Sequence, residues 1–518
     1  MTVSGDPAEQ PTVDARIARG AATNFVGTLA KLLHPAFLVL ANRLYGPSEV
    51  GLYVVATTIV ELCAGLINGG WRDAVLLVGG RHAEGDDPSD QQALYDGLGQ
   101  AVQAVILGSA AVTALALGFG APLLSWISPH HDVYALVMWM LPVLWCLGLA
   151  EVGIAATKVL MIMRYDALIL GFLKPAAMVV GAVVVFAFRP DATGLAIAFA
   201  AAHVALPVAT FFVVRRHFSI ARIFRAAVRT RPSARLWGFA LPQSANMALV
   251  YFTTGIDVLL LGYFGVATDR IAYYKTASTV LRNVRQVKLS FSGAFNPVAA
   301  HLFAARKLEE LAVQITTVSR WSATIGHPIL LVVVALHSEI LRVFEPSYGG
   351  FAGFVVLLAL LPALSNALGL AGNTIVMAGF SRLNLINTAV NVVVTLAVGF
   401  WLIPEHGLVG AAIATMASSV VGTLMQLAEL RFVVGVRVPY ARLAAPNIAL
   451  VVGATAGAAM WWIGAAWPGW VSDLGAALAS IAAYVALLAV WGLPAEDAAV
   501  LRPWRRAALR KPAPDRPD

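Results

Sequence analysis

The sequence predicts an all-α polytopic membrane protein with about fourteen transmembrane helices, arranged as two pseudo-symmetric six-helix lobes plus two extra C-terminal helices. Three observations predict this fold class. The 518 residues are 59% hydrophobic and only 12% charged, whereas a soluble domain is about 45–50% apolar and about 25% charged. Apolar runs of about 20 residues, enough for a helix to cross a bilayer, recur along the chain. Landmarks of the first half also return in the second half, in the same order.

The apolar runs are expected to form the spanning helices, in chain order and joined by short connections. They cover residues 20–44, 50–78, 94–119, 133–157, 168–188, 194–214, 236–264, 271–299, 312–336, 351–371, 384–402, 407–432, 443–466 and 471–493. No connection between them is long enough for a folded soluble domain.

These runs divide the chain into six parts. They are an N-terminal segment (1–19), a first lobe (20–214), a basic linker (215–235), a second lobe (236–432), two further spans (443–493) and a polar, Pro-rich tail (494–518). Lys and Arg concentrate in alternate connections and in the tail, which predicts that both termini are cytoplasmic. The first 19 residues contain three acidic side chains and do not resemble a cleaved signal peptide.

The net charge of +8 does not indicate nucleic-acid binding, because the arginines sit in short loops between apolar runs. The linker 215–235 is the most basic connection. Its apolar residues Ile220, Ile223, Phe224 and Val228 alternate with arginines. We expect an amphipathic helix here that lies on anionic membrane lipids.

An internal duplication is indicated by four pairs of landmarks. The pairs are Asn24 and Asn246, Gly46 and Gly265, Arg164 and Arg382, and Pro190 and Pro404, at offsets of 222, 219, 218 and 214. Each repeat holds six spans, an even number, so the two lobes should have the same orientation. They should therefore be related by an axis along the membrane normal and face each other across a central cleft.

A stripe of cations marks the eighth span. Lys275, Arg282, Arg285 and Lys288 are spaced 7, 3 and 3 residues apart, on one face of a helix. A cation at the bilayer centre costs at least about 2.5–3.5 kcal/mol. The stripe is expected to line a water-filled cavity and to receive an anionic cargo. The alternatives are that carboxylates neutralise these charges, or that the helix ends earlier and leaves them at the cytoplasmic surface.

Three further cations are candidates for the same anion site. Lys31 and His34 lie one turn apart in the first span, and Arg72 lies in the second. For His34 the alternative is a hydrogen-bonded residue ahead of Pro35. For Arg72, which precedes Asp73, the alternative is a local solvated patch.

Acidic residues are few within the spans. Glu61, Glu151 and Asp257 lie in the second, fourth and seventh. Each is expected to act as a counter-ion for a cavity cation. Binding of a coupling proton or sodium ion remains open as the alternative role.

No metal centre, cofactor or catalytic group is expected. Cys63 and Cys146 both lie in apolar runs, and no metal-ligand spacing is present. No Walker A sequence is present either, so the sequence does not support ATP hydrolysis within this chain.

Two stretches resemble a known family. Residues 41–70, ANRLYGPSEVGLYVVATTIVELCAGLINGG, and the later PEHGLVGAAIATMAS resemble bacterial polysaccharide flippases of the multidrug/oligosaccharidyl-lipid/polysaccharide exporter superfamily. Fourteen spans match the polysaccharide and lipid II flippase branches, whereas multidrug exporters of this fold usually have twelve.

The resemblance implies a function and its setting. An undecaprenyl-diphosphate-linked glycan, a repeat unit of O-antigen, exopolysaccharide or another polysaccharide, would move from the cytoplasmic to the periplasmic leaflet of the inner membrane. The two lobes would rock in alternating access around a cavity lined by the first, second, seventh and eighth helices. The motion would couple to a proton or sodium gradient or to the membrane potential. Polymerase and export machinery are implied partners.

Three other functions remain as alternatives. A cation-coupled multidrug exporter would favour an acidic cavity, whereas here the basic residues within spans outnumber the acidic ones. A polysaccharide polymerase or ligase would need periplasmic loops to hold catalytic groups, and these connections are short. A non-transporting assembly scaffold would tolerate substitutions in the cavity.

Overall fold

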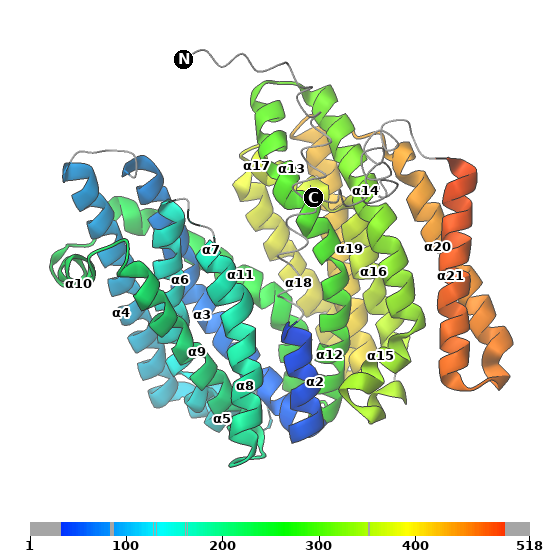
Figure 1. The fold of residues 1–518 in the computed structure, drawn as a ribbon, viewed down its shortest axis with the longest axis horizontal. Coiled ribbons are helices and arrows are strands. Elements are labelled where there is room, and N and C mark those ends of the chain that lie inside the picture. Colours follow the sequence, from blue (N-terminus) through cyan, green and yellow to red (C-terminus); the bar gives the residue numbers. More distant parts are fainter. Residues whose placement is uncertain are drawn as a thin grey trace, which may run out of the picture.

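The computed structural model describes the backbone of residues 33–82, 88–127, 129–130, 132–160, 162, 164–350 and 353–492. Every regular element in these ranges is a helix, and two groups of helices stand side by side (Figure 1). The predicted N-terminal segment and C-terminal tail lie outside the described residues. This part of the chain therefore has the predicted all-α architecture.

The first lobe is built from the helices before residue 215, followed by the linker helix. They are α2 (Leu33–Tyr45), α3 (Pro47–His82), α4 (Pro88–Ile127), α5 (Asp132–Met140), α6 (Pro142–Val159), α7 (Arg164–Asp166), the π-helix η2 (Ala167–Leu173), α8 (Lys174–Phe186), α9 (Ala192–Val214) and α10 (Ile220–Arg229). Within this lobe α3 packs on α4 and α6, and α9 packs on α6 and α8.

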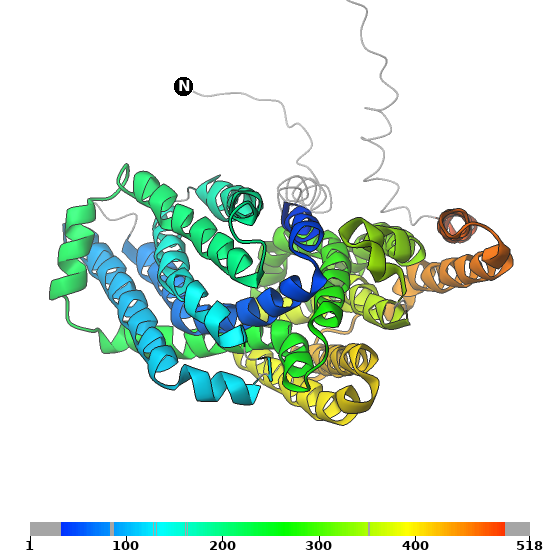
Figure 2. The same ribbon diagram turned by 90° about the horizontal axis from the view of Figure 1, so that it is seen from below.

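The second lobe begins with the long helix α11 (Ala234–Tyr263). Its helices are α12 (Thr268–Val284), α13 (Gln286–Ala304), α14 (Leu308–Ala335), α15 (His337–Phe344), η3 (Pro346–Gly350), α16 (Gly353–Leu368), α17 (Leu370–Met377), α18 (Ser381–His406) and α19 (Leu408–Phe432). After η4 (Tyr440–Leu443), the chain adds α20 (Ala444–Ile463), η5 (Gly464–Ala466) and α21 (Gly469–Trp491). The α20–α21 pair packs on α14 at the edge of the second lobe (Figure 2).

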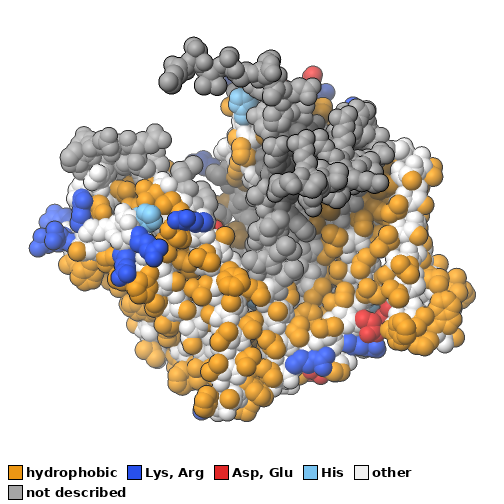
Figure 3. Space-filling view, in the orientation of Figure 1, with side chains coloured by type: hydrophobic (Ala, Val, Ile, Leu, Met, Phe, Trp, Pro, Cys, Tyr) orange, Lys and Arg blue, Asp and Glu red, His pale blue; other side chains and the backbone are white. Residues whose placement is uncertain are grey.

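Eleven segments of the described chain are long and apolar enough to cross a membrane. The number rises to twelve if α16 and α17, bent by 51° at Gly369, count as one broken span. One face of the molecule is dominated by hydrophobic side chains, with charged groups near its margins (Figure 3). The protein is therefore a multi-pass membrane protein.

Two predicted spans are absent from this set for different reasons. The first, 20–44, lies mostly outside the described residues, which begin at Leu33 in α2. The eighth, 271–299, was expected as one helix, but it is divided at Arg285 into α12 and α13. The break leaves α12 with 17 residues, and polar side chains lower the hydropathy of both halves, so neither half reads as an apolar span.

The two lobes meet along α3 and α11. A Cβ atom at Gly65 or Gly69 of α3 would overlap the side chains of Tyr251 or Met247 of α11. At Gly70 it would overlap the backbone carbonyl of Ala240, and the Gly70 N–H donates to Ser244 Oγ at 3.1 Å. Small residues permit this close approach of two membrane helices.

Substituting Gly70 by Ala should destabilise the protein by about 1–3 kcal/mol, the usual cost of overpacking. The new Cβ atom would overlap the backbone of Ala240 and not a flexible side chain, so repacking of side chains cannot relieve the overlap. Gly118→Ala is the matched control, because nothing lies within 4 Å of a Cβ there. We expect a lower melting temperature in detergent for the first variant only. Equal melting temperatures would contradict the tight α3–α11 contact.

The lobes are also tied at the end where α2 finishes. Arg43 donates to the backbone carbonyls of Val343 (Nε, 3.0 Å) and Arg342 (Nη2, 2.8 Å) in α15. Tyr348 Oη donates to the buried Asn42 Oδ1 at 2.6 Å. These bonds join α2 of the first lobe to α15 and η3 of the second, so the lobes are held together at this end.

Candidate functional site

The predicted cationic stripe lies on both sides of the helix break at Arg285. The Arg285 N–H bonds to the Arg282 carbonyl at 3.1 Å, a short three-residue turn that ends α12 before α13 begins. Lys275 and Arg282 therefore belong to α12, and Lys288 lies in the first turn of α13. The break exposes Arg285 to solvent although protein atoms surround it on most sides.

Arg282 has a carboxylate partner. Its Nη2 lies 3.4 Å from Asp257 Oδ2, and its Nη1 donates to the Thr254 carbonyl at 2.8 Å. Asp257 is 2% exposed and also accepts hydrogen bonds from the Val258 N–H (2.9 Å) and Tyr274 Oη (3.0 Å). Arg282 therefore matches the alternative in which a carboxylate, here that of Asp257, neutralises a cation of the stripe.

Arg285 and Lys288 differ from Arg282. Among the described residues, no carboxylate lies within ion-pair distance of either side chain. The charge that acts on Arg285 is that of Arg282, and the charge that acts on Lys288 is that of Arg285. A Cβ atom at Gly369 would lie 2.7 Å from Lys288 Nζ, so the ammonium group lies at the bend between α16 and α17.

A small cavity borders the stripe. It has a volume of about 10 Å³ and is lined in part by Asp257, Arg282 and Arg285. That is room for about one water molecule. A diphosphate does not fit in this space, so the helices that line it must separate before a group of that size can contact both Arg282 and Arg285 there.

The first lobe brings its own charges toward the stripe. His34 on α2 is exposed and lies within electrostatic range of Glu61 on α3, Lys174 on α8 and Lys275 on α12. Lys275 in turn lies within range of Glu61, Arg282 and Asp257. Lys31 lies outside the described residues. The structure thus brings His34 and Glu61 together with the α12 cations, across the junction of the two lobes.

Arg72 has a more local environment. Its Nε lies 3.2 Å from Asp73 Oδ1, and Gln243 Nε2 donates to Asp73 Oδ2 at 2.8 Å. Arg72 is also within electrostatic range of Glu151 on α6. These contacts agree with the alternative for Arg72, a local patch with Asp73 instead of a place in the anion site.

Lys174 lies near both groups of charges, a placement that the sequence did not predict. It lies within electrostatic range of both His34 and Glu151. The available signal was a lysine next to Pro175 inside an apolar run. His34 and Glu151 lie on α2 and α6, so the apolar run alone did not reveal that Lys174 is near them.

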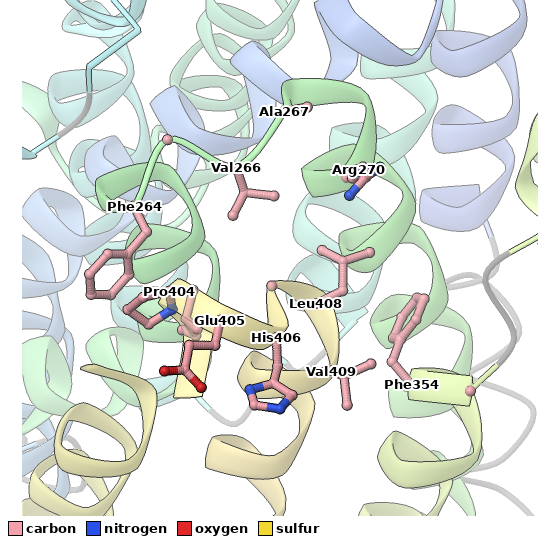
Figure 4. A pocket seen from close by; sticks show the side chains of 14 residues that line it. Phe264, Val266, Ala267, Arg270, Phe354, Pro404, Glu405, His406, Leu408 and Val409 are labelled. Carbon is pink, nitrogen blue, oxygen red and sulfur yellow. The ribbon is translucent and has the colours of Figure 1, made fainter. Parts of the chain in front are cut away.

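A separate cavity of about 620 Å³ lies at the ends of α11 and α18 (Figure 4). Glu405 and His406, at the end of α18, line it together with Arg270 of α12. Because Glu405 and His406 belong to the PEHGLVG motif, this motif lines the separate cavity and does not contribute to the cationic stripe.

The corresponding place in the first lobe has a different cap. There, Asp191 accepts a hydrogen bond from the Gly194 N–H at 2.8 Å, and Glu49 accepts one from the Ala192 N–H at 2.7 Å. In the second lobe, Gly407 begins α19 with a φ of 52° and no side-chain cap. The two lobes therefore turn differently here, because residues 187–191 separate α8 from α9, whereas Gly407 alone separates α18 from α19.

Comparison with known proteins places this geometry in a fold. No protein-family model matches the chain, and neither does any curated protein sequence. Among solved structures, lipid II flippase MurJ in an inward closed conformation matches with a TM-score of 0.69 at 13% identity, covering 94% of this chain and 100% of that chain. The chain has the fold of a membrane transporter.

Two multidrug transporters also match. An inward-facing multidrug resistance MATE family transporter of the MOP superfamily gives a TM-score of 0.57 at 15% identity, covering 78% of this chain and 94% of that chain. The MATE multidrug transporter DinF-BH gives a TM-score of 0.57 at 15% identity, covering 83% of this chain and 98% of that chain. At these identities the likeness concerns the fold shared by flippases and exporters, not the cargo.

Proposed function

We propose that the protein is a flippase for a lipid-linked oligosaccharide, in the form of an undecaprenyl-diphosphate-linked polysaccharide, O-antigen or exopolysaccharide repeat unit. It moves this cargo from the cytoplasmic to the periplasmic leaflet of the bacterial inner membrane. The observation that carries the proposal is the pair Arg285 and Lys288, two cations without a carboxylate partner in the described chain, at a helix break within a membrane-embedded lobe.

The chemistry of these side chains suits a diphosphate. An arginine contacts a phosphate through two parallel N–H bonds, and a lysine adds a compact positive charge. Arg282 stands beside them and holds Asp257 at 3.4 Å. An entering diphosphate competes with Asp257 for Arg282, so this cation is balanced when the site is empty and available when the cargo arrives.

The closed end of the molecule suggests how access alternates. Arg43 and Tyr348 join the lobes where α2 ends, on the side that the charge distribution predicts to be periplasmic. Release of the cargo then requires these bonds to break while the opposite end closes. In this proposal both termini lie in the cytoplasm, and the chain catalyses no chemical step. Its partners are polysaccharide polymerase and export proteins.

A multidrug exporter is the second candidate, because transporters of that name share the fold. The cations at Arg285 and Lys288 would repel a cationic drug. Ethidium efflux from cells or vesicles separates the two functions, since only an exporter lowers the retained dye.

Reconstitution in liposomes tests the proposal directly. A fluorescent undecaprenyl-diphosphate oligosaccharide is incorporated, and its exposure in the outer leaflet is scored with a membrane-impermeant reagent. We expect exchange above protein-free liposomes, with or without an imposed potential or sodium gradient. Absence of exchange under all these conditions, together with ethidium efflux, would replace the flippase by the exporter.

A further inference from the structure

The linker helix α10 is fixed to the first lobe through α4. Its buried Ala226 and Ala227 face Gly99 of α4, where a Cβ would lie 2.6 Å from the Ala226 Cβ. Thr230 Oγ1 donates to Asp96 Oδ1 at 3.1 Å, and the Ser233 N–H donates to Gln100 Oε1 at 2.7 Å. The helix therefore has one defined inner face and one defined outer face.

The N-terminal end of α10 is also fixed to α4. Ser219 caps the helix by accepting from the Arg222 N–H at 3.4 Å, and its own N–H donates to Tyr95 Oη at 3.0 Å. The Arg222 guanidinium lies 4.0 Å from the centre of the Tyr95 ring, a cation–π contact. Arg222 is thus engaged with α4 and is not part of the outer face.

The outer face combines two large apolar side chains with arginines. Phe224 and Val228, one turn apart, are 67% and 69% exposed. Arg225 and Arg229 lie next to them around the helix, and Arg216 is exposed just before it. Residues 215–231 contain no acidic side chain. Lys and Arg side chains gather at this outer corner of the first lobe (Figure 3).

The position of α10 in the chain limits what its outer face can contact. Only residues 215–219 separate it from α9, and residues 230–233 from α11, both of which are membrane spans. Such short connections hold α10 at the membrane surface. A helix with exposed apolar side chains beside exposed arginines lies in the plane of that surface, with its apolar groups below anionic headgroups.

We propose that α10 binds anionic phospholipid at the membrane surface, with Arg216, Arg225 and Arg229 on the headgroups and Phe224 and Val228 inserted beneath them. Because α10 is bonded to α4, this contact anchors the first lobe at that surface. The proposal concerns the lipid environment and does not depend on the cargo.

Lipid binding by the full-length protein in detergent provides the test. The protein is titrated with phosphatidylglycerol or phosphatidylcholine, and bound lipids are counted by native mass spectrometry. We expect a preference for phosphatidylglycerol that falls by about fivefold for each arginine removed in R216Q/R225Q/R229Q. The variant R216K/R225K/R229K should keep the preference, because the attraction requires charge.

A matched variant removes three charges from exposed positions of the second lobe, K307Q/R382Q/R431Q. It should keep the preference. Equal losses in both glutamine variants would overturn the proposal, because net charge alone would then explain binding. The absence of a preference for phosphatidylglycerol in the wild-type protein would also overturn the proposal.

The apolar pair is tested in nanodiscs that contain phosphatidylglycerol. Phe224→Ser with Val228→Ser should remove most of the gain in melting temperature over phosphatidylcholine nanodiscs. Phe432→Ser with Val433→Ser, an exposed pair at the end of α19, should retain that gain. An unchanged gain in the α10 variant would overturn insertion of these side chains and leave the face open to a protein partner.

Discussion

Replacing Arg285 and Lys288 by glutamine should reduce translocation of a lipid-linked oligosaccharide by at least about tenfold, since one charge-assisted hydrogen bond contributes about 1.5–3 kcal/mol. The same variant should be at least as stable as the wild type. Neither cation has a carboxylate partner in the described chain. Removing them therefore breaks no ion pair and relieves the repulsion between neighbouring cations of the stripe. Loss of activity without loss of stability is the signature of a binding site.

The variant leaves Arg282 in place, because its removal would strand Asp257. Arg285→Lys with Lys288→Arg keeps both charges and should retain most of the activity. Arg382→Gln with Arg437→Gln removes the same charge from exposed positions elsewhere and should be silent. The measurement is leaflet exchange in liposomes, with melting temperature as the check on folding. Full exchange by the R285Q/K288Q variant would remove these residues from the proposed site.

Replacing Asp257 by alanine should lower stability by about 1–3 kcal/mol, the cost of leaving buried polar groups without partners. Its carboxylate accepts hydrogen bonds from Val258 and Tyr274 and balances Arg282. Arg282 is itself about one-third exposed, so water screens part of the charge that remains. The readout is the melting temperature of purified protein in detergent.

A double-mutant cycle distinguishes the two roles of Asp257. If it is a counter-ion, D257N/R282Q should be more stable than the sum of the single variants implies, by a coupling of about 0.5–3 kcal/mol. If Asp257 instead binds a coupling proton or sodium ion, D257N should abolish gradient dependence of exchange and the second substitution should restore nothing. Additive losses of stability would contradict the counter-ion role.

The positions of most spans could be predicted from the sequence, because crossing a bilayer is a local requirement. A run of about 20 apolar residues satisfies its backbone only as a helix, wherever its neighbours are. The repeat was visible for a similar reason. Gly46 and Gly265 both take positive φ values, 86° and 65°, immediately after a helix, a conformation that favours glycine at each matched position.

The candidate site could be predicted only in part. Cations within an apolar run are rare enough to stand out, so the stripe from Lys275 to Lys288 was evident in the sequence. The break at Arg285 was not evident, because this segment has no proline or glycine near that residue. The large cavity near His406 was also missed, since it results from packing between helix ends.

The sequence by itself determined that this protein crosses the membrane many times and that its basic residues between Lys275 and Lys288 form a stripe, and it predicted that the two halves repeat. These properties depend on residue type and local spacing. Only the tertiary structure decided that Asp257 pairs with Arg282, that Lys174 lies near both His34 and Glu151 and that α10 faces outward with Phe224. Coulomb energy falls with the distance between charges, and helix packing rather than chain position sets that distance.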